Sequence, residues 1–513
     1  MKENKWYQKL LRSRLFFCLL ILFQLVFLIY YISSQSKTSE IIKTLLQLTS
    51  IVVALHIISR RDKEAYKLTW VFTILIFPVF GGLMYLFFRC QTRSKKLRQT
   101  MKKIEETVRS GYELSPSAYT KAIEATPDHA RQIEYIERYS NGPIFENTIT
   151  EYLSPGEKFL DSLLPELEKA ERYIFIETFI IQEGIMWDSI LEILKKKAAA
   201  GVDVRIIYDD MGCFLRIPKS FPKDLQKFGI QCFTFNQFIP VLTAVQNYRD
   251  HRKIIVIDGK VAFTGGLNIA DEYINKTHPF GHWKDSGIRI EGEAAWSFTL
   301  IFLQMWLLIG HKESDFSKYY PWNDVSCPIQ KTDSFVQPYA DTPLDDENVS
   351  DHIYMQLINK AKKYLYIMTP YLIVDNSMVS ALCTAAKSGV DIRIMTPYHW
   401  DKRVVHFMTR SYYREFLKAG IQIYEYKPGF IHSKTFVSDD EVATIGTANM
   451  DFRSLYLQFE CGAWLYKAEA VNELRDDFLN TLPLCKKIRA EDCRSNALIR
   501  FIQDVLRLFA PLM

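Results

Sequence analysis

The chain has 513 residues, enough for about three domains of ordinary size, so it is not a small disulfide-stapled module. Hydrophobic residues make up 48% and charged residues 24%, which excludes a disordered chain and a protein built only of membrane-spanning helices. The net charge of +5 is too small to predict a nucleic-acid-binding surface along the whole chain, and the nine cysteines include no CxxC pair that would indicate a zinc site.

The N-terminal region is predicted to be a membrane anchor. Residues 15–32 and 68–88 form uncharged runs that are long enough to cross the hydrocarbon layer as helices. Residues 41–58 form a run of similar length that carries Lys43, Gln47 and His56, so this segment crosses the bilayer, lies at its surface or packs as a core helix. We therefore expect a multi-pass protein of the cell membrane, with two or three transmembrane helices in residues 1–110.

The orientation of this anchor stays open. With two crossings, all the large clusters of Lys and Arg fall on the cytoplasmic side. With three crossings, the basic cluster in residues 89–103 falls outside, against the positive-inside bias. This cluster is either the solvated start of a helix or a segment that binds anionic lipid headgroups.

Beyond residue 110 the chain alternates amphipathic helical patterns with short β-branched runs, and it repeats itself. The repeats are AERYIFIET at 170–178 with AKKYLYIMT at 361–369, GVDVRI at 201–206 with GVDIRI at 389–394, and KFGIQ at 227–231 with KAGIQ at 418–422. Each repeated glycine follows a helical pattern and precedes a strand pattern, as a helix C-terminal cap would. We predict an α/β protein with two homologous halves, residues 111–325 and 326–513.

A fourth repeated block carries the chemical groups. In both copies a histidine is followed by a lysine, an aspartate and an asparagine at the same spacing, which gives His251, Lys253, Asp258 and Asn268 in the first copy and His432, Lys434, Asp439 and Asn449 in the second. Strand periodicity places each His and Lys on one sheet face, and each Asp falls at a turn. A lone His-x-Lys is usually an exposed polar strand, but two matched copies predict a functional site.

These residue types suit a phosphodiester. One neutral imidazole attacks phosphorus while the other, protonated, gives its proton to the leaving alkoxide, and the lysines and asparagines hold the non-bridging oxygens. Gly265 and Gly446 permit close approach of a ligand to the backbone. This chemistry requires no metal and no other cofactor.

Each histidine should also have a carboxylate that fixes its tautomer. Asp285 and Glu460 are the candidates, with an ordinary surface acid as the alternative for each. The roles of Asp258 and Asp439 stay ambiguous as well, because an aspartate at a turn is often structural.

The spacing resembles that of the phospholipase D superfamily, whose HxKxxxxD motif occurs twice in its two-domain members. The segments NYRDHRKI at 247–254, GFIHSK at 429–434, TPY at 369–371 and RSYY at 410–413 resemble the bacterial cardiolipin synthases of that superfamily. The resemblance implies two α/β/α sandwich halves of the phospholipase D type behind an N-terminal transmembrane region. It also implies the catalytic residues His251, Lys253, Asp258, His432, Lys434 and Asp439.

The activity that this resemblance implies is a phosphatidyl transfer. Two phosphatidylglycerols would give cardiolipin and glycerol through a phosphohistidine, with His251 as the nucleophile and His432 as the acid. The expected partners are phosphatidylglycerol and other anionic membrane lipids, with no nucleic acid, and the oligomeric state stays open.

Three other functions remain as alternatives. A phospholipase D that hydrolyses phospholipids would use the same pocket with water as the acceptor. A nuclease would need a basic groove and no access to lipid, so the predicted membrane spans argue against it. A non-catalytic membrane scaffold would be expected to lose motif residues, and none is lost.

Overall fold

The computed structural model describes residues 26, 30, 37–60, 64–76, 81, 82, 85, 92–115, 117–238, 244–323 and 331–512. The chain forms two compact units. One contains residues 98–237 and 249–503 and carries both repeated halves, and the other contains residues 1–97, 238–248 and 504–513.

The smaller unit is built around α3 (Lys37–Ile58) and α4 (Glu64–Ile76). Val53, Ile57, Trp70, Ile74 and Tyr85 form its buried apolar cluster. The other side of α3 exposes a row of large apolar side chains, namely Ile41, Leu45, Leu48, Val52 and Leu55.

The predicted spans are described only in part. Residues 15–32 lie outside the described residues except for 26 and 30, and the segment 68–88 is described in α4 and at 81, 82 and 85. Within the described stretches, no helix combines the length and the apolar character that a bilayer crossing needs. The basic run after the last predicted span begins α6 (Thr92–Tyr112).

The first half is a seven-stranded mixed sheet with helices on both faces. Its strands, in spatial order, are β1 (Thr148–Leu153), β9 (Gly287–Gly292), β7 (Val261–Gly265), β6 (Ile254–Ile257), β2 (Tyr173–Thr178), β3 (Asp203–Asp209) and β4 (Gln231–Phe235). Of its helices, α9 (Gly156–Lys169) and α10 (Ile185–Ala199) pack together, α11 (Phe221–Gln226) leads into β4, and α12 (Ala295–Leu308) crosses β2, β6, β7 and β9. β2 and β6 are buried along their whole length because both faces of the sheet are covered.

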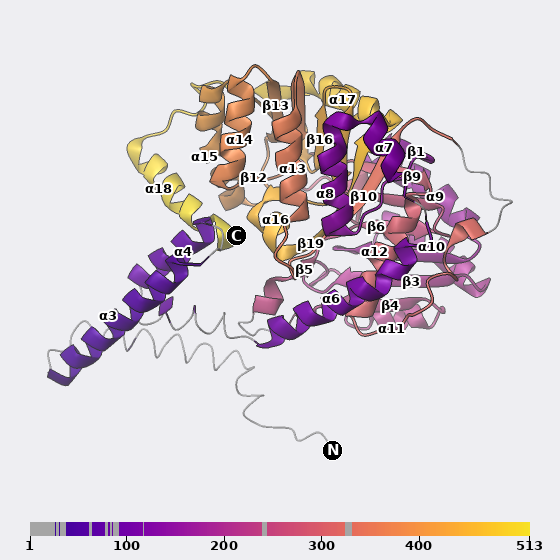
Figure 1. Ribbon diagram of the computed structural model, residues 1–513, viewed down its shortest axis with the longest axis horizontal. Coiled ribbons are helices and arrows are strands. Elements are labelled where there is room, and N and C mark those ends of the chain that lie inside the picture. The colour runs from indigo at the N-terminus through magenta and orange to yellow at the C-terminus, as the bar shows by residue number, and fades with distance from the viewer. Residues whose placement is uncertain are drawn as a thin grey trace. The chain divides into compact units, whose positions relative to one another are not determined.

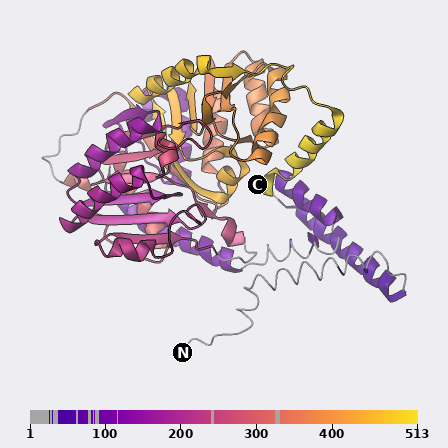
Figure 2. The ribbon, with the colours of Figure 1, turned by 180° about the vertical axis from the view of Figure 1, so that it is seen from behind.

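The second half repeats this order. Its strands are β10 (Phe335–Asp341), β19 (Gln458–Tyr466), β17 (Val442–Gly446), β16 (Thr435–Ser438), β11 (Tyr364–Met368), β13 (Asp391–Pro397) and β14 (Gln422–Tyr426), with β20 (Cys485–Lys487) added at the β14 edge. Its helices are α13 (Val349–Lys360), α14 (Asn376–Lys387), α15 (Arg403–Ala419), α16 (Phe452–Leu457) and α17 (Glu469–Thr481). In Figure 1, α13, α14 and α15 lie side by side along this sheet. The magenta first half faces the viewer in Figure 2.

The turn chemistry that the repeats predicted is confirmed. Gly201, Gly389, Gly229 and Gly420 have φ angles of 92°, 102°, 80° and 97°, and they follow α10, α14, α11 and α15. This left-handed backbone ends a helix at little cost only when the residue is glycine. The turn expected at Asp258 is also present, since Asp258 (φ 54°) and Gly259 (φ 68°) join β6 to β7 as a hairpin.

Two short strand pairs join the halves. β5 (Arg249–Asp250) from the first half runs parallel to the start of β19 in the second. β8 (His282–Lys284) from the first half runs parallel to β15 (Gly429–Ile431) in the second. β5 ends immediately before His251, and β15 ends immediately before His432, so each strand pair leads directly into the predicted site.

The segment before the first sheet does not pack only on the first half. α8 (Ala130–Ser140) lies against β10 and α13 of the second half, and the Gln337 amide donates hydrogen bonds to the carbonyls of Ile133 and Gly142. α17 of the second half in turn lies against β1 of the first. These exchanged contacts make the halves one folding unit rather than two separable domains.

Candidate active site

The two histidines precede equivalent strands of the two halves. His251 stands three residues before the start of β6, and His432 three residues before the start of β16. Both are buried, each with 7% of its surface exposed. The Lys253 ammonium donates a hydrogen bond to the His251 carbonyl at 2.5 Å, and the Lys434 ammonium donates to the His432 carbonyl.

The β5–β19 pair brings His251 to a carboxylate of the other half. The pair continues past β5, because the His251 N–H donates to the Phe459 carbonyl at 3.0 Å. His251 therefore stands opposite Glu460, and its Nδ1 lies 2.9 and 3.1 Å from the two carboxylate oxygens. Glu460 is fully buried, and the Thr447 hydroxyl also donates to it.

The β8–β15 pair does the same for His432. The His432 N–H donates to the Lys284 carbonyl at 2.7 Å, and Nδ1 lies 2.6 Å from Oδ2 of Asp285. Asp285 is fully buried and also accepts the Ser286 N–H at 2.8 Å. Both predicted carboxylates therefore contact a histidine, and each does so across the boundary between the halves.

Aromatic rings enclose both imidazoles. The Phe179 ring lies 5.1 Å from that of His251, and the rings of Trp283 and Tyr273 lie 5.2 and 5.6 Å from that of His432. These apolar walls exclude water and strengthen the electrostatic interactions within the site.

Charge and burial lower the pKa of each basic group in the site. Burial, together with the charges of Lys253 and Lys434, lowers the pKa of His251 well below its usual value and that of His432 to about 4. Burial also lowers the pKa of Lys253 to about 8 and that of Lys434 to about 7. Each lysine acts on the histidine of the other half as well as on its own, so the four groups form one site.

The two carboxylates differ. Burial raises the pKa of Glu460 to about 7, although Lys253 opposes this effect. Burial alone would also raise the pKa of Asp285, but the adjacent His432 and the charge of Lys434 hold it below its usual value. Near neutral pH Asp285 is ionised, whereas Glu460 is close to half-ionised.

The motif aspartates have a different environment. The Asp258 carboxylate accepts the backbone N–H groups of Glu171, Arg172 and Tyr173, each at 2.8 Å. Asp439 accepts those of residues 362, 363 and 364 at 2.8–2.9 Å. Each carboxylate thus fixes the turn that leads into β2 or β11, the strand that pairs with the motif strand β6 or β16. This turn lies at the opposite end of the motif strand from the histidine.

Two asparagines and two glycines were predicted to bind substrate, and their surroundings in the structure differ. Asn268 is occupied by the protein, since its Oδ1 accepts the Ile180 N–H at 3.0 Å and its Nδ2 donates to the Tyr273 hydroxyl at 2.6 Å. Asn449 is buried, and its Oδ1 has no hydrogen-bond partner among the described residues. A Cβ at Gly265 or Gly446 would lie 2.5 Å from the carbonyl of the neighbouring strand, so strand packing, not a ligand, requires glycine there. Contact of these four residues with substrate remains a prediction.

A buried charged cluster beside His251 was missed by the sequence analysis. Arg252 is 1% exposed, and it donates from Nε to the Glu460 carbonyl and from Nη2 to the Asp341 carbonyl, both at 3.2 Å. Its Nη1 also lies 3.8 Å from Glu177. The equivalent residue in the second motif is Ser433. The arginine in place of serine between the motif His and Lys was the sequence signal that could have indicated this charged cluster.

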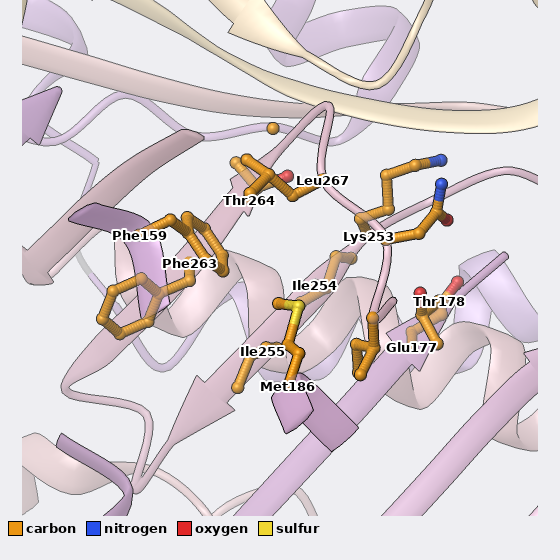
Figure 3. Close-up of a pocket in the computed structure, with 13 residues that line it drawn as sticks. Phe159, Glu177, Thr178, Met186, Lys253, Ile254, Ile255, Phe263, Thr264 and Leu267 are labelled. Atoms are coloured by element: carbon orange, nitrogen blue, oxygen red, sulfur yellow. The ribbon is translucent and has the colours of Figure 1, made fainter. Parts of the chain in front are cut away.

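A small pocket lies beside Lys253, and Figure 3 shows the residues that line it. Its walls are mainly apolar, with Phe159, Met186, Phe263 and Leu267 among them, while Lys253 and Glu177 provide its polar edge. Within the described parts of the chain, no group of three or more His, Cys, Asp or Glu side chains is placed to hold a metal ion.

The duplicated α/β/α fold and the paired His-Lys motifs define an enzyme of the phospholipase D type with two homologous halves. A family model described as cardiolipin synthase, PLD-like domain, matches residues 163–306 and 354–482, and the chain belongs to this family. A second model, described as phospholipase D-nuclease N-terminal, matches residues 49–89 and supports a membrane-associated protein.

Relatives match nearly the whole chain. An uncharacterised protein of Streptococcus mutans is 37% identical over 90% of this chain and 99% of its own length. A cardiolipin synthase of Halalkalibacterium halodurans is 34% identical over 91% of this chain and 93% of its own. Among solved structures, the phosphatidylserine synthase of Haemophilus influenzae shares the fold, with a TM-score of 0.55, 14% identity, and coverage of 74% of this chain and 97% of that one.

Proposed function

We propose that this enzyme condenses two phosphatidylglycerols into cardiolipin and glycerol through a phosphohistidine. The observation that carries the proposal is the pair of buried His–carboxylate dyads, His251 with Glu460 and His432 with Asp285. Relatives named cardiolipin synthase, matching nearly the whole chain, support the choice of substrate.

The first step transfers the phosphatidyl group to a histidine. Because Nδ1 of His251 is hydrogen-bonded to Glu460, Nε2 is the nitrogen available to attack phosphorus. The bond from phosphorus to the glycerol headgroup oxygen breaks, and His432 gives its proton to that oxygen. Glycerol leaves, and the phosphatidyl group remains on His251.

The second step reverses these roles. A hydroxyl of the second phosphatidylglycerol attacks the phosphohistidine, His432 takes the hydroxyl proton, and the P–N bond breaks. Cardiolipin forms, and both histidines return to their starting protonation states. In both steps the Lys253 and Lys434 ammonium groups stabilise the non-bridging oxygens, where charge is spread in the transition state.

The difference between the dyads favours His251 as the nucleophile. Ionised Asp285 stabilises a proton on His432, as an acid requires. Burial and the charges of Lys253 and Lys434 keep His251 neutral, as a nucleophile requires, and Glu460, with a pKa of about 7, opposes this effect less strongly than an ionised carboxylate would. A bound phosphodiester offsets the two lysine charges, and this raises the pKa of His432 toward the range in which it carries a proton.

Asp258 and Asp439 act in this proposal as positioning residues. Each fixes the backbone of the turn before β2 or β11, the strands that pair with the motif strands β6 and β16. The exposed apolar row on α3 and the runs at 15–32 and 68–88 support a multi-pass anchor that holds the enzyme at its lipid substrate.

The test uses purified full-length enzyme in vesicles of phosphatidylglycerol, followed by rapid acid-free quenching. Radiolabelled phosphate is expected on the peptide that contains His251, and cardiolipin and glycerol are expected in equal amounts. A label on His432 would reverse the two roles, and the absence of an adduct in every variant would replace the covalent scheme by direct displacement. Phosphatidic acid in place of cardiolipin would identify a hydrolase.

A further inference from the structure

Two exposed loops occupy equivalent positions in the two halves. Residues 211–219 follow β3, and residues 398–404 follow β13 and include the first two residues of α15; we call these segments the rim loops. β6 is antiparallel to β2, and β3 is parallel to β2. The start of β6, next to His251, and the end of β3 therefore lie at the same end of the strands. The same relation holds for His432 and β13.

The first rim loop reaches the His251 side of the site through one side chain. Cys213 is buried beneath the loop, and its Sγ accepts the Ile181 N–H at 3.2 Å and lies 3.6 Å from the Phe179 carbonyl. The Phe179 ring in turn packs against His251.

The second rim loop reaches the His432 side. The Tyr371 hydroxyl donates to Asp401 at 2.5 Å, and the Lys402 ammonium lies 5.1 Å from the centre of the Tyr371 ring. Phe430 connects Tyr371 to His432, at ring distances of 6.4 and 6.1 Å. Each rim loop is therefore anchored at the edge of the catalytic site.

Large apolar side chains on both rim loops face solvent. Leu215 is 89% exposed, and Trp400 and Val404 are each 49% exposed. Leu215 also has a φ of 64°, a left-handed conformation that is costly for a branched side chain. A strained backbone that presents a leucine to water is unfavourable unless the leucine enters another apolar phase.

Basic residues stand beside these apolar side chains. Lys219 lies near Leu215, and Lys402 and Arg403 follow Trp400, all in exposed positions, while Arg216 next to Leu215 is paired with Glu272 at 3.1 Å. Such a combination matches an anionic bilayer, in which apolar side chains enter the acyl region and cations meet the headgroups. The pocket beside Lys253 is far too small for an acyl chain, so it offers the lipid tails no place inside the protein.

We propose that the two rim loops insert into the surface of an anionic bilayer on either side of the active site. The phosphodiester then reaches the histidines while the acyl chains stay in the lipid. This inference rests on the proposed function, because it supposes a phospholipid substrate.

The test compares two substrates with full-length enzyme. Leu215→Asn keeps a residue that accepts a left-handed backbone, and Trp400→Gln removes the indole. Phe228→Gln is the matched control, since Phe228 is 46% exposed but lies just before the start of β4, at the opposite sheet edge. Burial of one large apolar side chain predicts that each rim variant loses about tenfold or more in turnover of long-chain phosphatidylglycerol in vesicles. Turnover of monomeric dihexanoyl-phosphatidylglycerol should stay within about twofold of wild type, because no bilayer is then involved.

Unchanged turnover in vesicles, or an equal loss with both substrates, would overturn the proposal. Fluorescence provides a measurement that does not depend on activity. Brominated phosphatidylglycerol should quench the emission of wild-type protein more than that of Trp400→Phe, and equal quenching would place Trp400 outside the bilayer. If wild-type enzyme makes no cardiolipin from either substrate, the proposed function fails, while quenching still tests the rim loops.

Discussion

The unequal dyads predict unequal costs when each carboxylate is made neutral. Asp285→Asn and Glu460→Gln preserve shape but remove the charge that supports the histidine. A hydrogen bond to a charged group is worth about 1.5–3 kcal/mol, which corresponds to a loss of about 10- to 150-fold in kcat/KM. Asp285 is ionised throughout the working range because its pKa is lowered, so Asp285→Asn should show this full loss at every pH.

Glu460 behaves differently because its pKa is about 7. At about pH 6 only about a tenth of the Glu460 side chains are ionised, and at about pH 8 roughly nine-tenths are. A protonated Glu460 resembles glutamine, so the loss caused by Glu460→Gln should grow up to about ninefold over this interval as the pH rises. At about pH 6 the two variants should therefore differ by as much as about tenfold, with Asp285→Asn the slower.

The assay is the pH profile of kcat/KM for cardiolipin formation, because this parameter reports groups of the free enzyme. Glu166→Gln is the matched control, since Glu166 is a largely buried carboxylate that pairs with Lys169 and Arg289 away from the histidines. Thermal unfolding of all three variants checks the fold. Equal losses for both dyads, with no pH dependence of either ratio, would refute the reasoning.

Three further results are expected. His251→Ala and His432→Ala should each lower kcat by at least about 100-fold with unchanged circular dichroism, and near-wild-type activity in either variant would contradict a shared site. Lys434, with a pKa of about 7, loses its charge as the pH rises, so Lys434→Arg should move the alkaline limb of kcat/KM to higher pH; an unmoved limb would assign that limb to another group. A saturating chelator should leave turnover unchanged once the effect of divalent ions on lipid packing is controlled, and a loss that zinc or magnesium restores would contradict the metal-free chemistry.

Much of the fold could be predicted because the chain repeats itself. Short apolar runs flanked by glycine predicted the strands, and the repeated glycines at 201, 389, 229 and 420 predicted the helix ends. These features depend on local backbone preferences, which a sequence states directly. The position of α8 against β10 could not be predicted in this way, because it depends on which sheet leaves a face open for it.

The site, like the fold, could be predicted only in part from the sequence. The spacing of His251 and Lys253 and of His432 and Lys434 predicted two half-sites, and Glu460 and Asp285 were selected as candidates. The pairing of each histidine with the carboxylate of the other half depends on the strand pairs β5–β19 and β8–β15, which join residues about 150–210 positions apart. The backbone contacts of Asp258 also join residues far apart in sequence, 85 and 87 positions for Tyr173 and Glu171, so its environment became visible only in the folded chain.

The exchange of carboxylates between halves has a consequence for how such a site can change over time. A single half would hold a histidine without its carboxylate, so its smallest working form would be a pair of identical copies with two identical dyads. Joining the copies in one chain frees each to vary, and here one dyad carries glutamate and the other aspartate. In the same way, the residue between His and Lys is Arg252 in the first motif and Ser433 in the second. Fusion thus allows one histidine to be tuned for attack and the other for proton transfer, a division of labour that a symmetric pair of separate chains has no means to encode.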